Sequence, residues 1–346
     1  MYQVFVKDPS TSDLYELPYI SASFNEELNV GKDAKFVFDF NSVKEVASAY
    51  NKTVEFIFSG ALREIYIQKG SKKIYSGVVS DYDLSKNANG DLNLNIASVG
   101  FFSLLGKRRT GAKREFSNTD AGDIAWTLIN ESQISDTPYS DLGITRGSHP
   151  TTKNRDRTFR FANIKDEITQ MSNDNLKDGF DFDIDNDKKF NIYFPTRGTQ
   201  RSEIILDDRN IVSWSYRRPG PLSLTNQVYV LGDGFNDDVL YVKRTSSTDY
   251  RSSYKLLEDV LSARDIITTD TLNDKGDRFL LDNQSPLGQL TISHLDDEPD
   301  ITSYDLGDSV RVQIDELNIN LTYFRVVKRN IQIDNSGLMI CTLNLQ

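Results

Sequence analysis

Alternation of apolar and polar residues is clearest over residues 19–40. Two alternating runs flank a polar segment with a glycine, residues 25–32. Residues two apart lie on the same face of a strand, so this pattern predicts a β-hairpin. The second run carries three phenylalanines on one face, and we predict that they anchor a core: Phe36, Phe38 and Phe40.

Further stretches within residues 2–105 have strand patterns. They cover residues 2–6, 53–59, 62–68, 73–84 and 91–100. Asn89-Gly90 predicts a tight hairpin turn between the last two. Ser42 and Glu45 have the spacing of a capping box, which predicts a helix over residues 42–50. Closely spaced antiparallel strands with one helix favour a small barrel or a sandwich.

Residues 106–202 follow a different pattern. A basic, glycine-containing segment is interpreted as a linker. Apolar residues at helical spacing predict a helix from Thr119 or Asp120 to about residue 132 and another over 164–175. Between them lies a polar stretch, which we predict to be a long loop. A hairpin over residues 179–194 completes an inserted α+β domain.

Residues 203–346 return to strands. The strand patterns cover residues 203–206, 211–217, 225–232, 240–243, 288–293, 309–315, 321–333 and 338–345. Helical patterns over residues 253–284, in two pieces, interrupt them, so we expect a helical insertion at about 246–285. The predicted fold class is therefore β-rich α+β, with strands at both ends of the chain and insertions between them.

Net charge, cysteine content and apolar stretches argue against several classes of protein. The net charge of −11 argues against a surface that binds nucleic acid. Cys341 is the single cysteine, which excludes an intrachain disulfide. We find no apolar stretch long enough to span a bilayer and no signal-peptide pattern at the start, so we expect synthesis in the cytoplasm without a secretion signal.

Three acidic residues of the hairpin over 179–194 are the one candidate for a metal site: Asp181, Asp183 and Asp185. Carboxylates two apart share a strand face and are ligands that Ca²⁺ accepts. The glycine and glutamate of a calcium loop are missing, however, and apolar residues alternate with the acids. We therefore favour a half-solvated hairpin, without a metal or other cofactor.

No catalytic signature stands out. His149 and His294 lack metal-ligand spacing, and no nucleophile elbow is present. A triad assembled in space is not excluded by sequence, but a surface or loop role for the histidines is favoured. The basic residues Lys107, Arg108 and Arg109 fit an exposed linker or a contact between subunits, and we favour the contact.

Four segments occur in an order that resembles the baseplate or tail-tip hub proteins of tailed bacteriophages. They are GKDAKFVFDF, AGDIAWTLINES, DGFDFDIDNDKKFNIYF and SYDLGDSVRVQI. The likeness is to the hub of contractile phages and to the N-terminal part of tail-associated proteins of long-tailed phages. It extends over nearly the whole chain.

The resemblance implies two antiparallel β-barrels similar to tail-tube subunits, at residues 1–105 and 203–346, with the α+β domain at 106–202 between them. It also implies a homotrimeric ring, whose six barrels match a sixfold tail tube while its threefold side faces the tip. Such a hub is a structural virion protein of the tail tip, not an enzyme. Any activity on the host cell wall is then expected to come from another protein.

The resemblance further implies its partners. They are a distal tail or tube ring, a spike or fibre protein of the tip and the C-terminus of a tape-measure protein, with DNA passing through the lumen without specific binding. The hairpin tip would contact a neighbouring subunit through Asn25, Glu26, Glu27, Asn29 and Lys32. The alternatives are a distal tail ring protein and a tail-associated cell-wall hydrolase or glycan-binding module.

Overall fold

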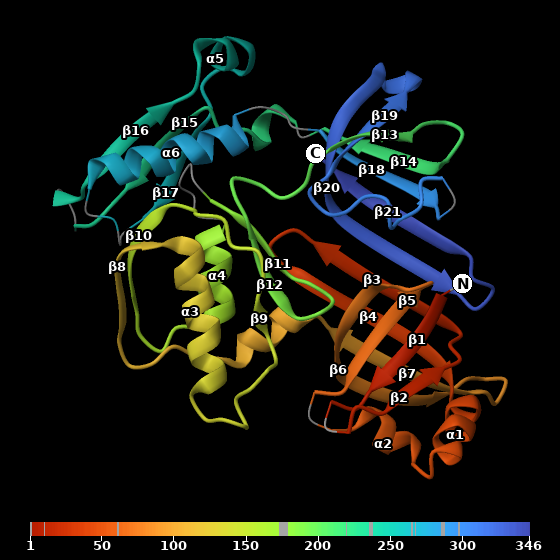
Figure 1. Ribbon diagram of the computed structural model, residues 1–346. Coiled ribbons are helices and arrows are strands. Elements are labelled where there is room, and N and C mark those ends of the chain that lie inside the picture. Colours follow the sequence, from red (N-terminus) through yellow and green to blue (C-terminus); the bar gives the residue numbers. More distant parts are fainter. Residues whose placement is uncertain are drawn as a thin grey trace.

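Strands from both ends of the chain form one large sheet in the computed structural model. The structure describes residues 2–9, 11–60, 62–172, 179–218, 220–234, 238–263, 266, 268–284, 288–296 and 298–346. The sheet has 13 strands, in the order β14-β18-β21-β20-β3-β4-β7-β6-β5-β1-β2, with β19 pairing with β20 and β13 with β19. Two insertions lie beside this sheet (Figure 1).

Residues 2–99 form the N-terminal sheet region. Its elements are β1 (Tyr2–Lys7), β2 (Leu14–Leu17), β3 (Ser21–Glu27), β4 (Gly31–Asp39), α1 (Phe40–Ala49), α2 (Val54–Phe58), β5 (Glu64–Lys69), β6 (Lys72–Lys86) and β7 (Leu92–Val99). The predicted hairpin is β3 and β4. Alternate residues of both strands are buried, as their period-two pattern requires.

Strand β2 was not predicted, and two further details of this region differ from the prediction. Residues 53–59 were expected to be a strand, but they contain α2, because the Thr53 hydroxyl caps the helix by accepting a hydrogen bond from the Phe56 amide at 3.1 Å. Helix α1 begins at Phe40 rather than near Ser42. Its cap is Asp39, whose carboxylate accepts from the Ser42 amide at 2.8 Å.

Residues 100–199 form the α+β insert. Its elements are η1 (Phe101–Lys107), β8 (Arg114–Asp120), α3 (Ala121–Ile134), β9 (Thr145–Arg146), β10 (Asn154–Phe159), α4 (Ile164–Ser172), β11 (Asp181–Ile184) and β12 (Lys189–Tyr193). Asp120 caps α3, as expected. The expected linker instead contributes β8, which pairs with β10 from the expected loop. The end of the second expected helix, residues 173–175, lies outside the described residues.

The C-terminal sheet region comprises residues 200–217 and 289–345. Its elements are β13 (Gln200–Leu206), β14 (Ile211–Arg217), β18 (Gln289–Leu295), β19 (Ser309–Ile314), η4 (Asp315–Leu317), β20 (Ile319–Asp334) and β21 (Met339–Leu345). These strands agree with the sequence patterns to within a few residues. Strand β20 is long because it pairs with β19 along its first half and with β21 and β3 along its second.

A small α/β unit lies within residues 225–284, and the sequence patterns did not predict it as one unit. The elements from residue 221 onward are η2 (Pro221–Ser223), β15 (Gln227–Leu231), β16 (Tyr241–Thr245), α5 (Thr248–Tyr254), β17 (Glu258–Ser262) and α6 (Thr269–Asn283). Strands β15 and β16 were expected in the second barrel, and β17 was expected to be helical. They form a separate three-stranded sheet covered by α6, because Val228, Val230, Leu272 and Leu280 make a core of their own.

Pairing between β3 and β20 joins the two sheet regions. Seven residue pairs connect them, from Lys328 opposite Glu27 to Asp334 opposite Ser21. One hydrophobic cluster extends through both regions. In the described part of the chain the strand order is open, from β14 at one end to β2 at the other, so it does not show two separate closed barrels. The β-rich class with inserted helices is confirmed.

Among the described residues, no helix is both long enough and apolar enough to cross a membrane.

Candidate functional site: the charged junction

A buried ion pair links the first hairpin to the long C-terminal strand. Glu26 of β3 lies directly opposite Arg329 of β20. The Arg329 Nη2 and Nε atoms donate to Glu26 Oε2 at 2.5 and 3.0 Å, and the Glu26 side chain is only 2% exposed. Lys32 on the neighbouring strand β4 lies 3.1 Å from the other Glu26 oxygen. A carboxylate at this depth is stable only when it is paired, as it is here.

The positions of these charges follow from the strand period. Glu26 continues the buried series Ala22 and Phe24, and Arg329 lies in line with Ile331 and Ile333. Burial alone would raise the pKa of Glu26, but the positive charges of Arg329 and Lys32 lower it to about 2. Burial opposes the charge of Arg329 too, and Glu26 and Asp305 nevertheless raise its pKa.

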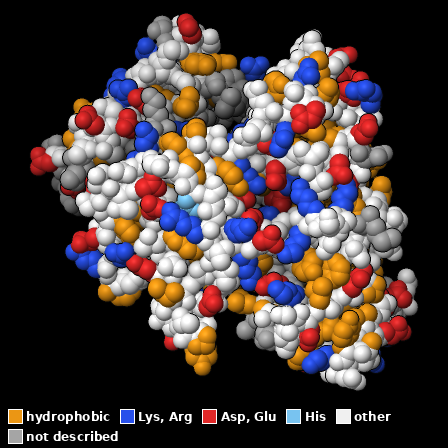
Figure 2. Space-filling view, in the orientation of Figure 1, with side chains coloured by type: hydrophobic (Ala, Val, Ile, Leu, Met, Phe, Trp, Pro, Cys, Tyr) orange, Lys and Arg blue, Asp and Glu red, His pale blue; other side chains and the backbone are white. Residues whose placement is uncertain are grey.

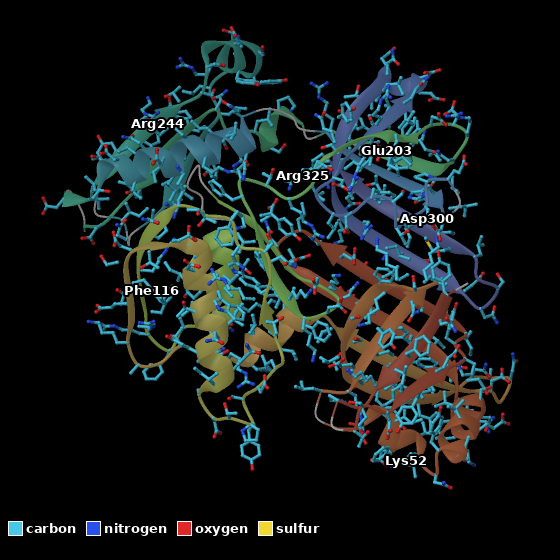
Figure 3. All side chains as sticks on the ribbon, in the orientation of Figure 1. Lys52, Phe116, Glu203, Arg244, Asp300 and Arg325 are labelled. Atoms are coloured by element: carbon cyan, nitrogen blue, oxygen red, sulfur yellow. The ribbon has the colours of Figure 1, made fainter. Side chains whose placement is uncertain are left out.

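Further ion pairs connect the α+β insert to the same place. Arg197, which follows β12, lies 3.0 Å from Asp183 of β11 and 3.5 Å from Asp305 of the C-terminal sheet region. Arg325 of β20, labelled in Figure 3, donates to Asp181 of β11 at 2.5 Å. Acidic and basic side chains gather where the insert meets the two sheet regions (Figure 2). We call this set, Glu26, Lys32, Asp181, Asp183, Arg197, Asp305, Arg325 and Arg329, the charged junction.

The turn between β3 and β4 contacts the insert of its own chain. The Asn29 amide donates to Asp181 at 2.8 Å, and its oxygen accepts from the Phe182 amide at 2.9 Å. Lys32 donates to Asn186 at 3.1 Å. Glu26, Asn29 and Lys32 were expected to contact another subunit. In the structure, Asn29 and Lys32 bond the insert of their own chain, and Glu26 is buried.

The other expected contact residues are more accessible. Asn25 bonds Asp33 on β4 at 2.9 Å, and Glu27 pairs with Lys328 at 2.9 Å near the surface. Lys107 and Arg109 are exposed at the end of η1. Arg108 is half-buried and donates to the Ser140 carbonyl at 2.8 Å. A contact of these residues with another subunit stays a prediction.

The three expected core anchors lie as follows. Phe36 and Phe38 of β4 are 1% and 0% exposed. Phe40, the first residue of α1, is half-buried and packs against the edge of the same core. Because the helix begins there, Phe40 does not continue the strand face of the other two.

The acidic residues of β11 are not arranged as a metal site. Among the described residues, no group of three or more acidic, histidine or cysteine side chains is placed to hold a metal. Asp181 and Asp183 are each paired with an arginine. Asp185 stabilises the turn to β12 by accepting from the Asp187 and Lys189 amides, each at 2.9 Å. In the described structure, ion pairs and a turn use these three carboxylates.

A cavity of about 100 Å³ lies within the charged junction. Its lining combines acids and bases, among them Glu26, Lys32, Asp183, Arg197 and Arg329. These groups are held by one another, since each carboxylate named here accepts from a cation within 3.1 Å. The arrangement is suited to holding the N-terminal sheet region, the insert and the C-terminal sheet region in fixed positions relative to each other.

His294 lies beside the charged junction, in the core. A surface or loop position was expected, but its side chain on β18 is 0% exposed. Its Nε2 atom lies 2.6 Å from the Tyr304 hydroxyl and its Nδ1 atom 2.8 Å from the Leu295 carbonyl. The carbonyl can only accept, so Nδ1 donates to it and Nε2 accepts from Tyr304. A neutral imidazole satisfies this arrangement.

Stability is therefore expected to decrease in mild acid. Burial lowers the pKa of His294, with Arg329 adding to the effect. Below the ordinary pKa of about 6.5, the unfolded chain binds the proton more readily than the folded chain, so the free energy of unfolding falls as pH decreases. Each unit by which the pKa is lowered contributes up to about 1.4 kcal/mol.

The check is urea unfolding at pH 7.5 and 5.5 for the parent and His294→Gln, whose side chain keeps an acceptor for Tyr304 but does not titrate. We expect a smaller decrease in stability for the variant. His149, whose pKa burial also lowers, acts equally in both proteins. Equal decreases would show that His294 does not contribute.

The chain is similar to known proteins in its structure, but its sequence matches none of the families or curated proteins compared. No protein-family profile and no curated protein matches this chain.

Solved structures that are similar to the chain include phage tail proteins. A tail protein from Neisseria meningitidis MC58 has a TM-score of 0.68 at 13% identity, over 99% of this chain and 96% of that one. The 43 kDa tail protein of prophage MuSo2 from Shewanella oneidensis has a TM-score of 0.70 at 9% identity, over 99% and 97%.

A protein of a related machine is similar as well. It is an E. coli component of the type VI secretion system that has structural similarity to the T4 bacteriophage tail proteins gp27 and gp5. Its TM-score is 0.52 at 8% identity, over 95% of this chain and 73% of that one. The resemblance to phage tail proteins is thus confirmed at the level of the fold: the chain has the fold that these phage tail proteins share with the secretion component.

Proposed function

We propose that the chain is a structural hub of a phage tail tip. Three copies form a ring in which each chain contributes two sheet regions, so that six of them match the sixfold tail tube while the threefold side receives the tip. The observation that carries this proposal is the pairing of β3 with β20. It holds two strand-rich regions of one chain in a single sheet with one core.

The charged junction supports this proposal, because a symmetry adaptor needs its two sheet regions in a fixed relation. Glu26 and Arg329 link the two regions at their shared edge. Arg197 and Arg325 tie the insert to the C-terminal sheet region, and Asn29 ties it to the N-terminal region. The similarity to phage tail proteins supports the location in a virion tail.

Other parts of the proposal concern partners. The ring lies between a distal tail or tube ring and a spike or fibre protein, contacts the C-terminus of the tape-measure protein and lets DNA pass. The net charge of −11 suits a channel that does not hold DNA, because basic residues that neutralise phosphates bind it strongly. The role is mechanical, without catalysis and without a cofactor.

The mass of the purified assembly tests this function. We expect three times the chain mass of 39.3 kDa by light scattering or native mass spectrometry. Electron microscopy of tails labelled with an antibody to the chain should show label at the tip only. A strict hexamer would contradict the hub and favour a distal tail ring, and cleared zones on a peptidoglycan zymogram would favour a cell-wall hydrolase.

A further inference from the structure

Besides the edges of β2 and β13, two free strand edges of the described sheet lie in different sheet regions. In the described part of the chain, β14 pairs with β18 on one side only. The outer part of β6, residues 80–86, pairs with β7, whereas β5 pairs only with the earlier residues of β6. Unpaired backbone groups along such an edge are a template for another strand.

The edge of β14 is apolar over most of its length, and Arg217 is its one charged residue. Residues 211–216 read IVSWSY, without a charged residue or a proline, which are devices that normally prevent edge pairing. Trp214 and Tyr216 are 38% and 40% exposed. They lie opposite Ile292 and Leu290 of β18, both fully buried, so they continue the core face of the sheet into solvent.

The outer part of β6 also has an apolar rim, although it carries more charged residues than β14. Tyr82 and Leu84 are 41% and 43% exposed. They lie opposite Ile96 and Leu94 of β7, which are buried, so they too continue a core face beyond the last paired strand. The alternate residues on the other face include Asp81 and Asp83, whereas β14 ends in Arg217 and is followed by Arg218.

We propose that β14 of one subunit pairs antiparallel with residues 80–86 of the next subunit, an inference that rests on the proposed ring. Placing Arg217 opposite Asp81 puts Tyr216 opposite Tyr82 and Trp214 opposite Leu84. Directly opposed residues share a face, so this register joins the two apolar rims on one side and the opposite charges on the other.

A second copy of the chain is the occupant that fits both edges. Each edge is seven residues long, each has an apolar rim on its core face, and their charges have opposite sign. The two edges are different surfaces, so the contact is heterologous and repeats from subunit to subunit. A repeated heterologous contact that closes is a ring.

Charge reversal tests the pairing in the full chain. Arg217→Asp and Asp81→Arg each place like charges directly opposite each other across the two strands, so we expect each to weaken self-association by about tenfold in sedimentation equilibrium. The two reversals together should restore it. Lys35→Asp, an equal change of charge at an exposed site on β4, is the matched control and should leave self-association unchanged.

Cross-linking tests the register. Ser215 and Asp83 are opposed in it, within reach of a disulfide. Mixed Ser215→Cys and Asp83→Cys chains should give a covalent heterodimer under oxidising conditions, whereas Ser117→Cys on the insert should not replace either partner.

A chain that stays monomeric at its solubility limit overturns the pairing, as does an oligomer that neither reversal weakens. Capture by another tail protein that depends on Arg217 while self-association does not would also overturn it. Failure of the function is distinguishable from failure of the pairing. If antibody labels the tail tip but the reversals leave the oligomer intact, the hub stands and the pairing is wrong. If the reversals dissociate the oligomer but tails lack the chain, the pairing stands and the hub is wrong.

Discussion

Replacing Arg329 by methionine is expected to lower the free energy of unfolding by about 3–5 kcal/mol. The substitution keeps an unbranched apolar stem but leaves Glu26, only 2% exposed, with Lys32 as its remaining cation. It also removes the donors to the Tyr304 carbonyl at 2.9 Å and the Ile301 carbonyl at 3.3 Å. Truncating one partner of a buried pair is costly mainly because the other charge stays buried.

The neighbouring residue of the same strand offers a matched control. Lys328 pairs with Glu27 at 2.9 Å across the same two strands, but both side chains are about two-fifths exposed. Exposed pairs contribute about 0–1 kcal/mol, so Lys328→Met should have a small effect. Urea unfolding in a Trp126→Phe background, where Trp214 is the remaining tryptophan and reports on the large sheet, measures both variants.

A double variant separates lost pairing from lost packing. Glu26→Met with Arg329→Met removes the charge that the single variant leaves uncompensated, so the double variant should be more stable than Arg329→Met alone. If it is less stable by the sum of both single effects, the pair is not coupled and the locking role of Glu26 and Arg329 is wrong.

Acid adds a second readout for the same pair. The pKa of Glu26 is lowered from 4.5 to about 2, so its contribution to stability is fully present above pH 4.5 and is lost as pH falls toward 2. In Arg329→Met this lowering should be largely removed. The decrease in stability between pH 4.5 and 2 should therefore be smaller in the variant than in the parent.

Local patterns were enough to predict most elements of the fold. The alternation in β3 and β4 and the helical spacing in α3 each record one buried face, which is why these elements were found at nearly correct positions. Helix α2 was missed because four of its five residues are apolar, two of them β-branched, and suit a strand equally well. Only the cap at Thr53 decides for a helix. Strands β8 and β10 were missed because both are short, polar and largely exposed.

The candidate site was only partly predictable. Glu26 and Arg329 occupy core-face positions of their strands, and a charge at such a position indicates a buried partner of opposite sign. The identity of the partner was not available, because the two residues are 303 positions apart and meet only when β3 pairs with β20. Which strand edges pair depends on the tertiary structure and not on the local sequence. For the same reason, β15 and β16 were wrongly assigned to the second barrel.

Phe38→Ala is expected to lower the free energy of unfolding by about 3–5 kcal/mol. Phe38 is 0% exposed, and its ring lies 5.8 Å from that of Phe58 and 6.0 Å from that of Phe36. Removing it leaves a cavity between β4 and the two helices that cover it. Lys35→Ala, on the exposed face of the same strand, is the control and should stay within about 0.5 kcal/mol.

The distribution of this loss decides whether the large sheet is one folding unit. One hydrophobic cluster includes Phe38 and also Leu343 of β21 in the other sheet region. Hydrogen exchange measured by mass spectrometry should therefore show protection reduced by similar amounts in peptides from β4 and from β21. If β21 keeps its full protection while β4 loses it, the two sheet regions unfold independently. The β3–β20 pairing would then be too weak to hold them as the rigid adaptor that the proposed ring requires.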